Sequence, residues 1–214
     1  MPIEVLKLDP ANPAPVLERA ASVLRAGGLV IYPTESFYAL GADALSAASV
    51  DRVYAAKGRP GEKPLPVIIH DKSLIGKYAV KLSARAEAAV RLLMPGPVTL
   101  VLWASDAFPK NLTAWSGKAG IRVPEHAVAS GLAAAFGGPV TATSANLSGL
   151  PGMTDPAELA EVFRDTAELL IDVGEAPGPP PSTLLDMTVE PPAILRPGRM
   201  PVEALEAVVG PLPA

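Results

Sequence analysis

The segment Leu29-Val30-Ile31-Tyr32-Pro33-Thr34 is an apolar run that stops at a proline and passes into polar residues. Residues 29–32 are predicted to form a short buried strand, because a brief continuous apolar run bounded by turn residues is typical of one. Thr34 follows at the end of this strand, where a loop residue can face a cavity, although a turn residue would also suit the position. The segment therefore predicts a core strand that leads directly into a polar loop.

The regions around this segment alternate between helical and extended patterns. Apolar residues between 16 and 24 fall on one helical face, Gly27-Gly28 ends that helix, and Ser46 is suited to cap the next one. Asp155-Pro156-Ala157-Glu158 has the composition of a helix start. Further helices are expected at 82–94, 126–136 and 202–209, and further strands at 3–8, 65–69, 98–103, 121–123, 140–143, 169–173, 183–187 and 193–195.

The order of these elements favours one mixed α/β domain over residues 1–214, without the strict period of a barrel. The Gly/Pro-rich stretch 176–181 is short and strands follow it. It is predicted to be a loop over the functional site and not a linker between domains.

Composition narrows the chemistry. Hydrophobic residues make up 49% of the 214 residues, enough for a sizeable core, and cysteine is absent. The absence of cysteine excludes disulfides, thiol nucleophiles and Cys-based zinc sites, and only two histidines argue against a His-rich metal site. No apolar run reaches the length of a membrane span and the N-terminus lacks a signal pattern, so we expect a cytoplasmic protein without membrane contact. The net charge of −4 argues against non-specific nucleic-acid binding by the whole surface.

Two polar motifs stand apart from the core pattern. Lys57-Gly58-Arg59-Pro60 follows an amphipathic helix, and Ser144-Ala145-Asn146-Leu147-Ser148-Gly149 follows an apolar run. Two neighbouring cations repel each other unless an anion lies between them or both point into water, and Arg is suited to planar oxyanions. Solvated cations near a helix end and an ordinary Ser or Asx turn would produce the same patterns. Taken together, the motifs indicate a site for a phosphorylated ligand.

Residues 31–41, Ile-Tyr-Pro-Thr-Glu-Ser-Phe-Tyr-Ala-Leu-Gly, resemble the YPTET-x-YGLG segment of YrdC-like proteins, the threonylcarbamoyladenylate synthases. Other family motifs follow in the same order along the chain: Lys57-Gly58-Arg59-Pro60, Pro95-Gly96-Pro97-Val98-Thr99-Leu100, Ile121-Arg122-Val123-Pro124, Ser144-Ala145-Asn146, Ser182-Thr183 and Leu195-Arg196-Pro197-Gly198. Ser36 and Ala39 depart from the usual Thr and Gly, and His70 is not matched to a family position. The resemblance covers roughly residues 15–210.

The resemblance implies an α/β fold, with a twisted mixed sheet flanked by helices around a large, concave, positively charged cavity. It implies the short form of the family, without the extra C-terminal domain of longer relatives. It also implies a reaction in which L-threonine, bicarbonate and ATP give L-threonylcarbamoyladenylate and pyrophosphate with the help of Mg²⁺. This is the first step of threonylcarbamoyladenosine modification of tRNA. The implied partners are the downstream tRNA threonylcarbamoyl transferase machinery and a weak contact with tRNA itself.

The resemblance also assigns the site residues. The ATP-binding residues are Lys57, Arg59, Ser144, Asn146 and Arg196, with Lys57 and Arg59 acting in catalysis by neutralising charge. The threonine-binding residues are Thr34, Arg122 and Ser182. The acids Glu35 and Asp43 could support a magnesium ion, but ATP and water supply most Mg²⁺ ligands, so no metal ligand is assigned.

Two other functions remain open on sequence grounds. Related domains of hydrogenase-maturation proteins make an adenylated carbamate from carbamoyl phosphate, although within much longer chains. A double-stranded RNA or tRNA binding module could use the same basic cavity without catalysis, although the acidic composition disfavours it.

Overall fold

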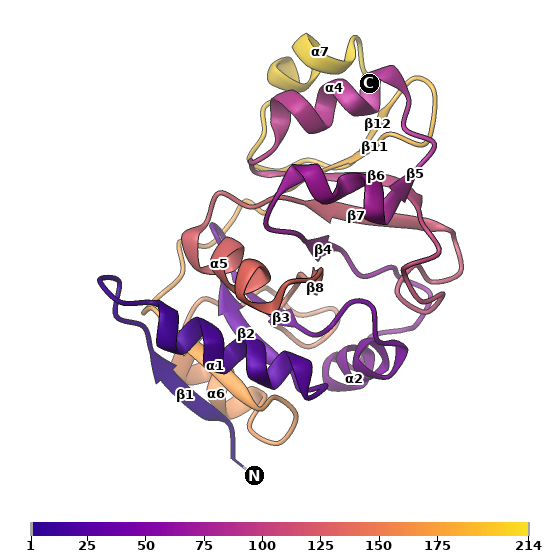
Figure 1. Ribbon diagram of the computed structural model, residues 1–214. Helices are drawn as coiled ribbons and strands as arrows, with labels where there is room; N and C mark the ends of the chain where they lie inside the picture. The colour runs from indigo at the N-terminus through magenta and orange to yellow at the C-terminus, as the bar shows by residue number, and fades with distance from the viewer. Residues whose placement is uncertain (1, 214) are drawn as a thin grey trace.

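The computed structural model describes residues 2–213, which form two mixed β-sheets with helices around them (Figure 1). The five-stranded sheet has the order β1-β10-β2-β3-β9. Its strands are β1 (Glu4–Lys7), β10 (Leu169–Asp172), β2 (Val30–Pro33), β3 (Tyr38–Gly41) and β9 (Thr143–Ser144). β1, β10 and β2 run parallel, whereas β2, β3 and β9 pair antiparallel.

The seven-stranded sheet has the order β12-β11-β6-β7-β4-β8, and β5 pairs with β6 beside this path. Its strands are β12 (Ala193–Arg196), β11 (Thr183–Asp186), β6 (Val98–Ala104), β7 (Lys118–Arg122), β4 (Val67–Ile68), β8 (Val140–Thr141) and β5 (Ala79–Val80). β11 runs parallel to β6 and β4 runs parallel to β7, while the other pairs are antiparallel.

The helices cover the sheets in two groups. α1 (Ala14–Arg25) packs on α5 (Ala127–Phe136), and their apolar faces form one core cluster with β2 and β10. α4 (Ala84–Leu93) packs on α7 (Val202–Val209) at the end of the molecule farthest from β1 (Figure 1). The remaining helices are α2 (Ala47–Lys57), α3 (Ile75–Tyr78), α6 (Pro156–Val162) and the 3-10 helix η1 (Lys72–Leu74). No helix within residues 2–213 has the length and apolarity needed to cross a membrane.

The α/β fold class is confirmed, and so are several local expectations. The Ser46 hydroxyl accepts from the backbone N–H of Ser49, and the Asp155 carboxylate accepts from that of Ala157, so both residues cap their helices. The final helix occupies the predicted residues 202–209. The strands, however, divide between two sheets, where the sequence suggested one.

Two strand expectations were wrong. Neither β3 nor β5 was foreseen, although all four residues of β3 are buried. The predicted strand at 140–143 is two strands in different sheets: β8 pairs with β4, and β9 pairs with β3. Ala142 lies at the switch, and its backbone N–H donates to the Pro66 carbonyl. The break occurs because the chain changes partners there, which local hydrophobicity does not reveal.

Candidate functional site

A cavity of about 660 Å³ lies between the two sheets. Its wall includes residues of β3 and β9 from one sheet and of β4, β6, β7 and β11 from the other. The structure brings together on this wall most of the residues that the sequence selected: Thr34, Arg59, Arg122, Ser144, Asn146, Ser182 and Arg196. The cationic side chains of the wall are Arg59, Lys63, Lys118, Arg122 and Arg196, and its carboxylate is Asp186.

Lys57 is the predicted site residue that is not on the wall. It ends α2 and is only 2% exposed. Its ammonium donates to the carbonyl oxygens of Ser144 and Asn146 and to Asn146 Oδ1, the last two at 2.6 and 3.2 Å. Lys57 therefore lies behind the Ser144–Asn146 loop and not on the cavity wall, where its charge pattern had placed it. Its contact with ATP remains a prediction.

Gly58 explains why Lys57 and Arg59 diverge. Gly58 has φ +56°, a left-handed conformation in which side chains are strained, and it ends α2. The turn leaves Lys57 on the inner face of the helix and carries Arg59 to the cavity. There Arg59 Nη2 donates to the Pro64 carbonyl at 3.0 Å, and Nε donates to that of Lys63 at 3.3 Å. Burial lowers the pKa of both cations, that of Lys57 to about 8, and Arg59 adds to the shift of Lys57 by repulsion.

The Ser144–Asn146 loop is ordered by its own polar groups. Ser144 Oγ donates to Asn146 Oδ1, while Asn146 Nδ2 donates to the carbonyls of Leu147 and Leu150 at 2.8 and 2.7 Å. The Asn146 amide is thus engaged within the loop, as in the turn interpretation, and both residues still line the cavity. Lys57 supports the loop from the protein interior, where its ammonium donates to the loop oxygens.

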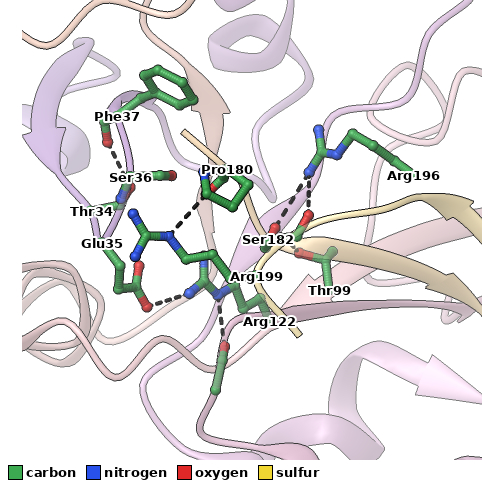
Figure 2. A network of polar contacts seen from close by, with 11 residues as sticks. Thr34, Glu35, Ser36, Phe37, Thr99, Arg122, Pro180, Ser182, Arg196 and Arg199 are labelled. Carbon is green, nitrogen blue, oxygen red and sulfur yellow. Dashed lines mark hydrogen bonds and ion pairs between the residues drawn. The ribbon is translucent and has the colours of Figure 1, made fainter. Parts of the chain in front are cut away.

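At the other end of the cavity, Thr34 and Ser36 line the wall while Glu35, between them, contacts Arg122 (Figure 2). Thr34 Oγ1 donates to the Phe37 carbonyl at 2.6 Å, which fixes the turn after β2. Arg122 Nη2 pairs with Glu35 Oε1, and Arg122 Nε donates to the Gly96 carbonyl at 3.0 Å. Burial lowers the pKa of Arg122, and the Glu35 carboxylate opposes that shift. The sequence weighed Glu35 only as a support for magnesium and gave no sign of its contact with Arg122.

Ser182 and Arg196 contact each other on the cavity wall. Ser182 Oγ and Thr99 Oγ1 are 3.0 Å apart, and Arg196 Nη2 donates to the Ser182 carbonyl at 2.8 Å (Figure 2). Arg196 was assigned to ATP and Ser182 to threonine. Their direct contact means that a ligand reaching one of them also approaches the other.

Arg199 holds the loop over the cavity and is not among the residues that the sequence selected. Its Nε donates to the Pro180 carbonyl at 2.9 Å (Figure 2). Its Nη2 donates to the Gly178 carbonyl at 3.1 Å. Residues 176–181, here called the strap, are also tied to the turn after β2, because the Gly178 N–H donates to the Ser36 carbonyl at 2.7 Å. Gly198 allows this packing, since a Cβ there would lie 2.4 Å from the Pro181 carbonyl oxygen. The predicted loop over the site therefore spans from one sheet to the other.

Metal ligands are not gathered by the fold. Within residues 2–213, no group of three or more His, Cys, Asp or Glu side chains is arranged to hold a metal ion. Glu35 is paired with Arg122, and Asp43 Oδ1 accepts from the Leu45 backbone N–H. These residues do not form a protein site for magnesium.

Comparison with known proteins relates this chain to one protein family. Residues 22–198 match the model of the Sua5/YciO/YrdC family, which is described as "Telomere recombination". The chain is 39% identical over 191 residues to a threonylcarbamoyl-AMP synthase of Pyrococcus abyssi, covering 89% of this chain and 56% of that protein. It is 36% identical to one of Bacillus subtilis, covering 92% of this chain and 58% of that protein.

A solved structure of the same family superposes closely on this chain. P. abyssi Sua5 complexed with L-threonine superposes with a TM-score of 0.92 at 36% identity, covering 96% of this chain and 61% of that one. The chain thus spans less than two-thirds of the length of these relatives. The family model nevertheless covers most of the chain, including the turn after β2, the Lys57–Arg59 motif, the Ser144–Asn146 loop and the strap. The chain belongs to the Sua5/YciO/YrdC family.

Proposed function

We propose that this protein is a threonylcarbamoyl-AMP synthase, which makes L-threonylcarbamoyladenylate and pyrophosphate from L-threonine, bicarbonate and ATP. The observation that carries the proposal is the joining of two unlike ends in one cavity. One end holds the Arg122–Glu35 pair beside the Thr34 turn, and the other holds Arg59 and the Ser144–Asn146 loop. The names of the relatives, and the threonine complex of P. abyssi Sua5, support the same assignment.

The reaction needs no covalent nucleophile. The threonine amine joins the bicarbonate carbon with loss of water, and an oxygen of the resulting carbamate displaces pyrophosphate from the α-phosphorus of ATP. The protein must hold anionic groups close together and offset the charge on the leaving pyrophosphate. Arg59 and Arg196 are suited to the phosphates, because backbone carbonyls occupy only some of their donors. The ends of the Arg122 guanidinium that Glu35 and Gly96 leave free are suited to the amino-acid carboxylate.

The finer assignments follow from this proposal. Ser144 and Asn146 would border the nucleotide, and Thr34 and Ser182 would border the threonine amine or hydroxyl. Magnesium would enter on the ATP phosphates, since residues 2–213 offer no ligand cluster for it. The product would be consumed by the tRNA threonylcarbamoyl transferase machinery, and any contact with tRNA would be weak.

Pyrophosphate release from ATP tests the proposal. We expect release only when threonine and bicarbonate are both present. We expect valine to be a very poor substrate and serine a weaker but real one, because a site that hydrogen-bonds a hydroxyl strongly rejects its apolar isostere. Equal turnover of valine and threonine would contradict the assignment of the threonine end. Turnover with carbamoyl phosphate in place of threonine and bicarbonate would favour the hydrogenase-maturation reaction, and tight RNA binding without turnover would favour a binding module.

A further inference from the structure

Four of the five cations on the cavity wall divide into two kinds by the groups that they contact. Arg122 is paired with Glu35, and Lys118 is paired with Asp186 at 3.3 Å. Arg59 and Arg196 instead contact only uncharged groups: the carbonyls of Lys63 and Pro64 for Arg59, and the carbonyl and hydroxyl of Ser182 for Arg196. Within residues 2–213 neither of these two arginines has an ion pair. The cavity therefore offers full positive charge at Arg59 and Arg196 and a neutralised guanidinium at Arg122.

The contact between Glu35 and Arg122 is close and largely shielded from water. Their side chains are 19% and 10% exposed. Arg122 donates from Nη2 to Glu35 Oε1 and from Nε to the Gly96 carbonyl. Its Nη1 and the second N–H of Nη2 therefore remain for a ligand. Two N–H groups on one end of the guanidinium suit a carboxylate.

The second carboxylate oxygen of Glu35, Oε2, is left unpaired within residues 2–213. This oxygen is buried and has no hydrogen-bond partner among the described residues. A half-satisfied buried carboxylate is costly for the fold, so its presence needs another explanation than stability. Glu35 thus places its carboxylate beside the ligand-binding end of Arg122.

The charge balance determines which anion this end accepts. A zwitterionic amino acid brings one carboxylate together with its own nearby amine, which the neutral Arg122–Glu35 pair tolerates. A phosphate group brings more than one negative charge close to Glu35, where repulsion in a partly buried site is strong. The same phosphate meets no carboxylate at Arg59 or Arg196.

We propose that Glu35 is a specificity-determining residue, which neutralises Arg122 so that this end of the cavity takes an amino-acid carboxylate and rejects the phosphate groups of ATP. The proposal rests on the assignment of Arg122 to threonine. Because ATP and threonine share one cavity, this exclusion prevents the nucleotide from occupying both subsites. It also keeps released pyrophosphate from competing with the next threonine.

Calorimetric titration of threonine, with and without inorganic phosphate, tests the proposal. The test variant is Glu35→Gln, which keeps the size of the side chain and removes its charge. The matched control is Glu125→Gln, because Glu125 is exposed and acts on Arg122 only through space. We expect phosphate to weaken threonine binding by about tenfold in Glu35→Gln and by less than about twofold in the wild type and in Glu125→Gln. Steady-state rates should then show phosphate competing with threonine only in the Glu35 variant.

The outcomes are separable. Threonine binding to Glu35→Gln that is as insensitive to phosphate as that of the control would overturn the proposal and leave the function intact. A wild-type protein that fails to bind threonine would overturn the proposed function and this inference with it. Should Gln prevent folding, as judged by the melting transition, Glu35→Asp serves instead. It withdraws the carboxylate by one methylene, and we expect phosphate to weaken threonine binding about threefold; no phosphate effect would contradict the proposal.

Discussion

Lys57 and Arg59 are cations separated by a single glycine, yet they occupy opposite environments. Lys57 is 2% exposed and gives its hydrogen bonds to the Ser144–Asn146 loop, whereas Arg59 lies on the cavity wall with donors to spare. The sequence assigned both to the same anion. The left-handed Gly58 separates them, so one cation supports the loop from behind and the other is available to a ligand from the front.

This comparison shows that a charge motif can combine two tasks. A buried ammonium without an acidic partner is costly, and only the oxygens of the loop offset that cost. Loop and lysine therefore depend on each other. Arg59 is held by two carbonyls on one side and has no comparable structural duty. Substitution of Lys57 should therefore lower mainly the stability of the fold, and substitution of Arg59 should lower mainly the rate of pyrophosphate formation.

The largest effect should come from Lys57→Ala on stability. The Asn146 carbonyl would lose its donor, at about 1–3 kcal/mol, whereas the Ser144 carbonyl keeps the Asn146 N–H and Asn146 Oδ1 keeps the Ser144 hydroxyl. The lost methylenes would also leave a cavity, at about 2–5 kcal/mol. Relief from burying a charge offsets part of this loss, so we expect the free energy of unfolding to fall by about 4 kcal/mol. Urea unfolding measures it. Arg59→Ala is the control and should lose less than about 1 kcal/mol; equal losses in both variants would erase the distinction.

The pH dependence of stability should identify the buried ammonium. Burial lowers the pKa of Lys57 to about 8 in the folded protein, against about 10.4 in the unfolded chain. Between these values the unfolded chain holds the proton and the folded protein does not, so stability rises with pH. Across that window we expect the wild type to gain up to about 3 kcal/mol relative to Lys57→Met, which has nothing to titrate there. A difference that stays constant from pH 7.5 to 10.5 would mean that Lys57 retains its ordinary pKa.

Arg59→Ala should act on chemistry. Removing a group that stabilises charge in the transition state typically costs on the order of a hundredfold in rate, about 2.7 kcal/mol. We expect a loss of this size in pyrophosphate formation with an almost unchanged melting temperature. Arg164→Ala is the control, since Arg164 is an exposed arginine of another region that pairs with Glu161. Normal turnover by Arg59→Ala would assign Arg59 to the solvated surface.

The features that the sequence predicted well are local ones. Ser46 and Asp155 cap helices through contacts two or three residues away, and such contacts can be inferred from neighbouring residue types. The split of 140–143 between two sheets depends on distant partners, β4 and β3. Arg122 and Ser144, which the motif resemblance selected, line one cavity. The resemblance could not show that Lys57 turns inward or that Glu35 meets Arg122, because these contacts join residues 87 or more positions apart.

The smallest effect should come from Arg199, which holds the strap as Lys57 holds its loop, through backbone carbonyls. Arg199 is only half-buried, so water can replace the hydrogen bonds that it gives to Gly178 and Pro180. We expect Arg199→Ala to lower kcat/KM for threonine about tenfold, or about 1.4 kcal/mol, because the strap carries the chain into Ser182.

Amide exchange at Gly178, whose N–H donates to Ser36, should become about tenfold faster in the same variant. Arg199→Lys should fall between the two, since an ammonium supplies the charge without the planar fork that reaches both carbonyls. If exchange at Gly178 and threonine kinetics both stay at wild-type values in Arg199→Ala, the strap is held by its backbone contacts alone, and the parallel with Lys57 fails.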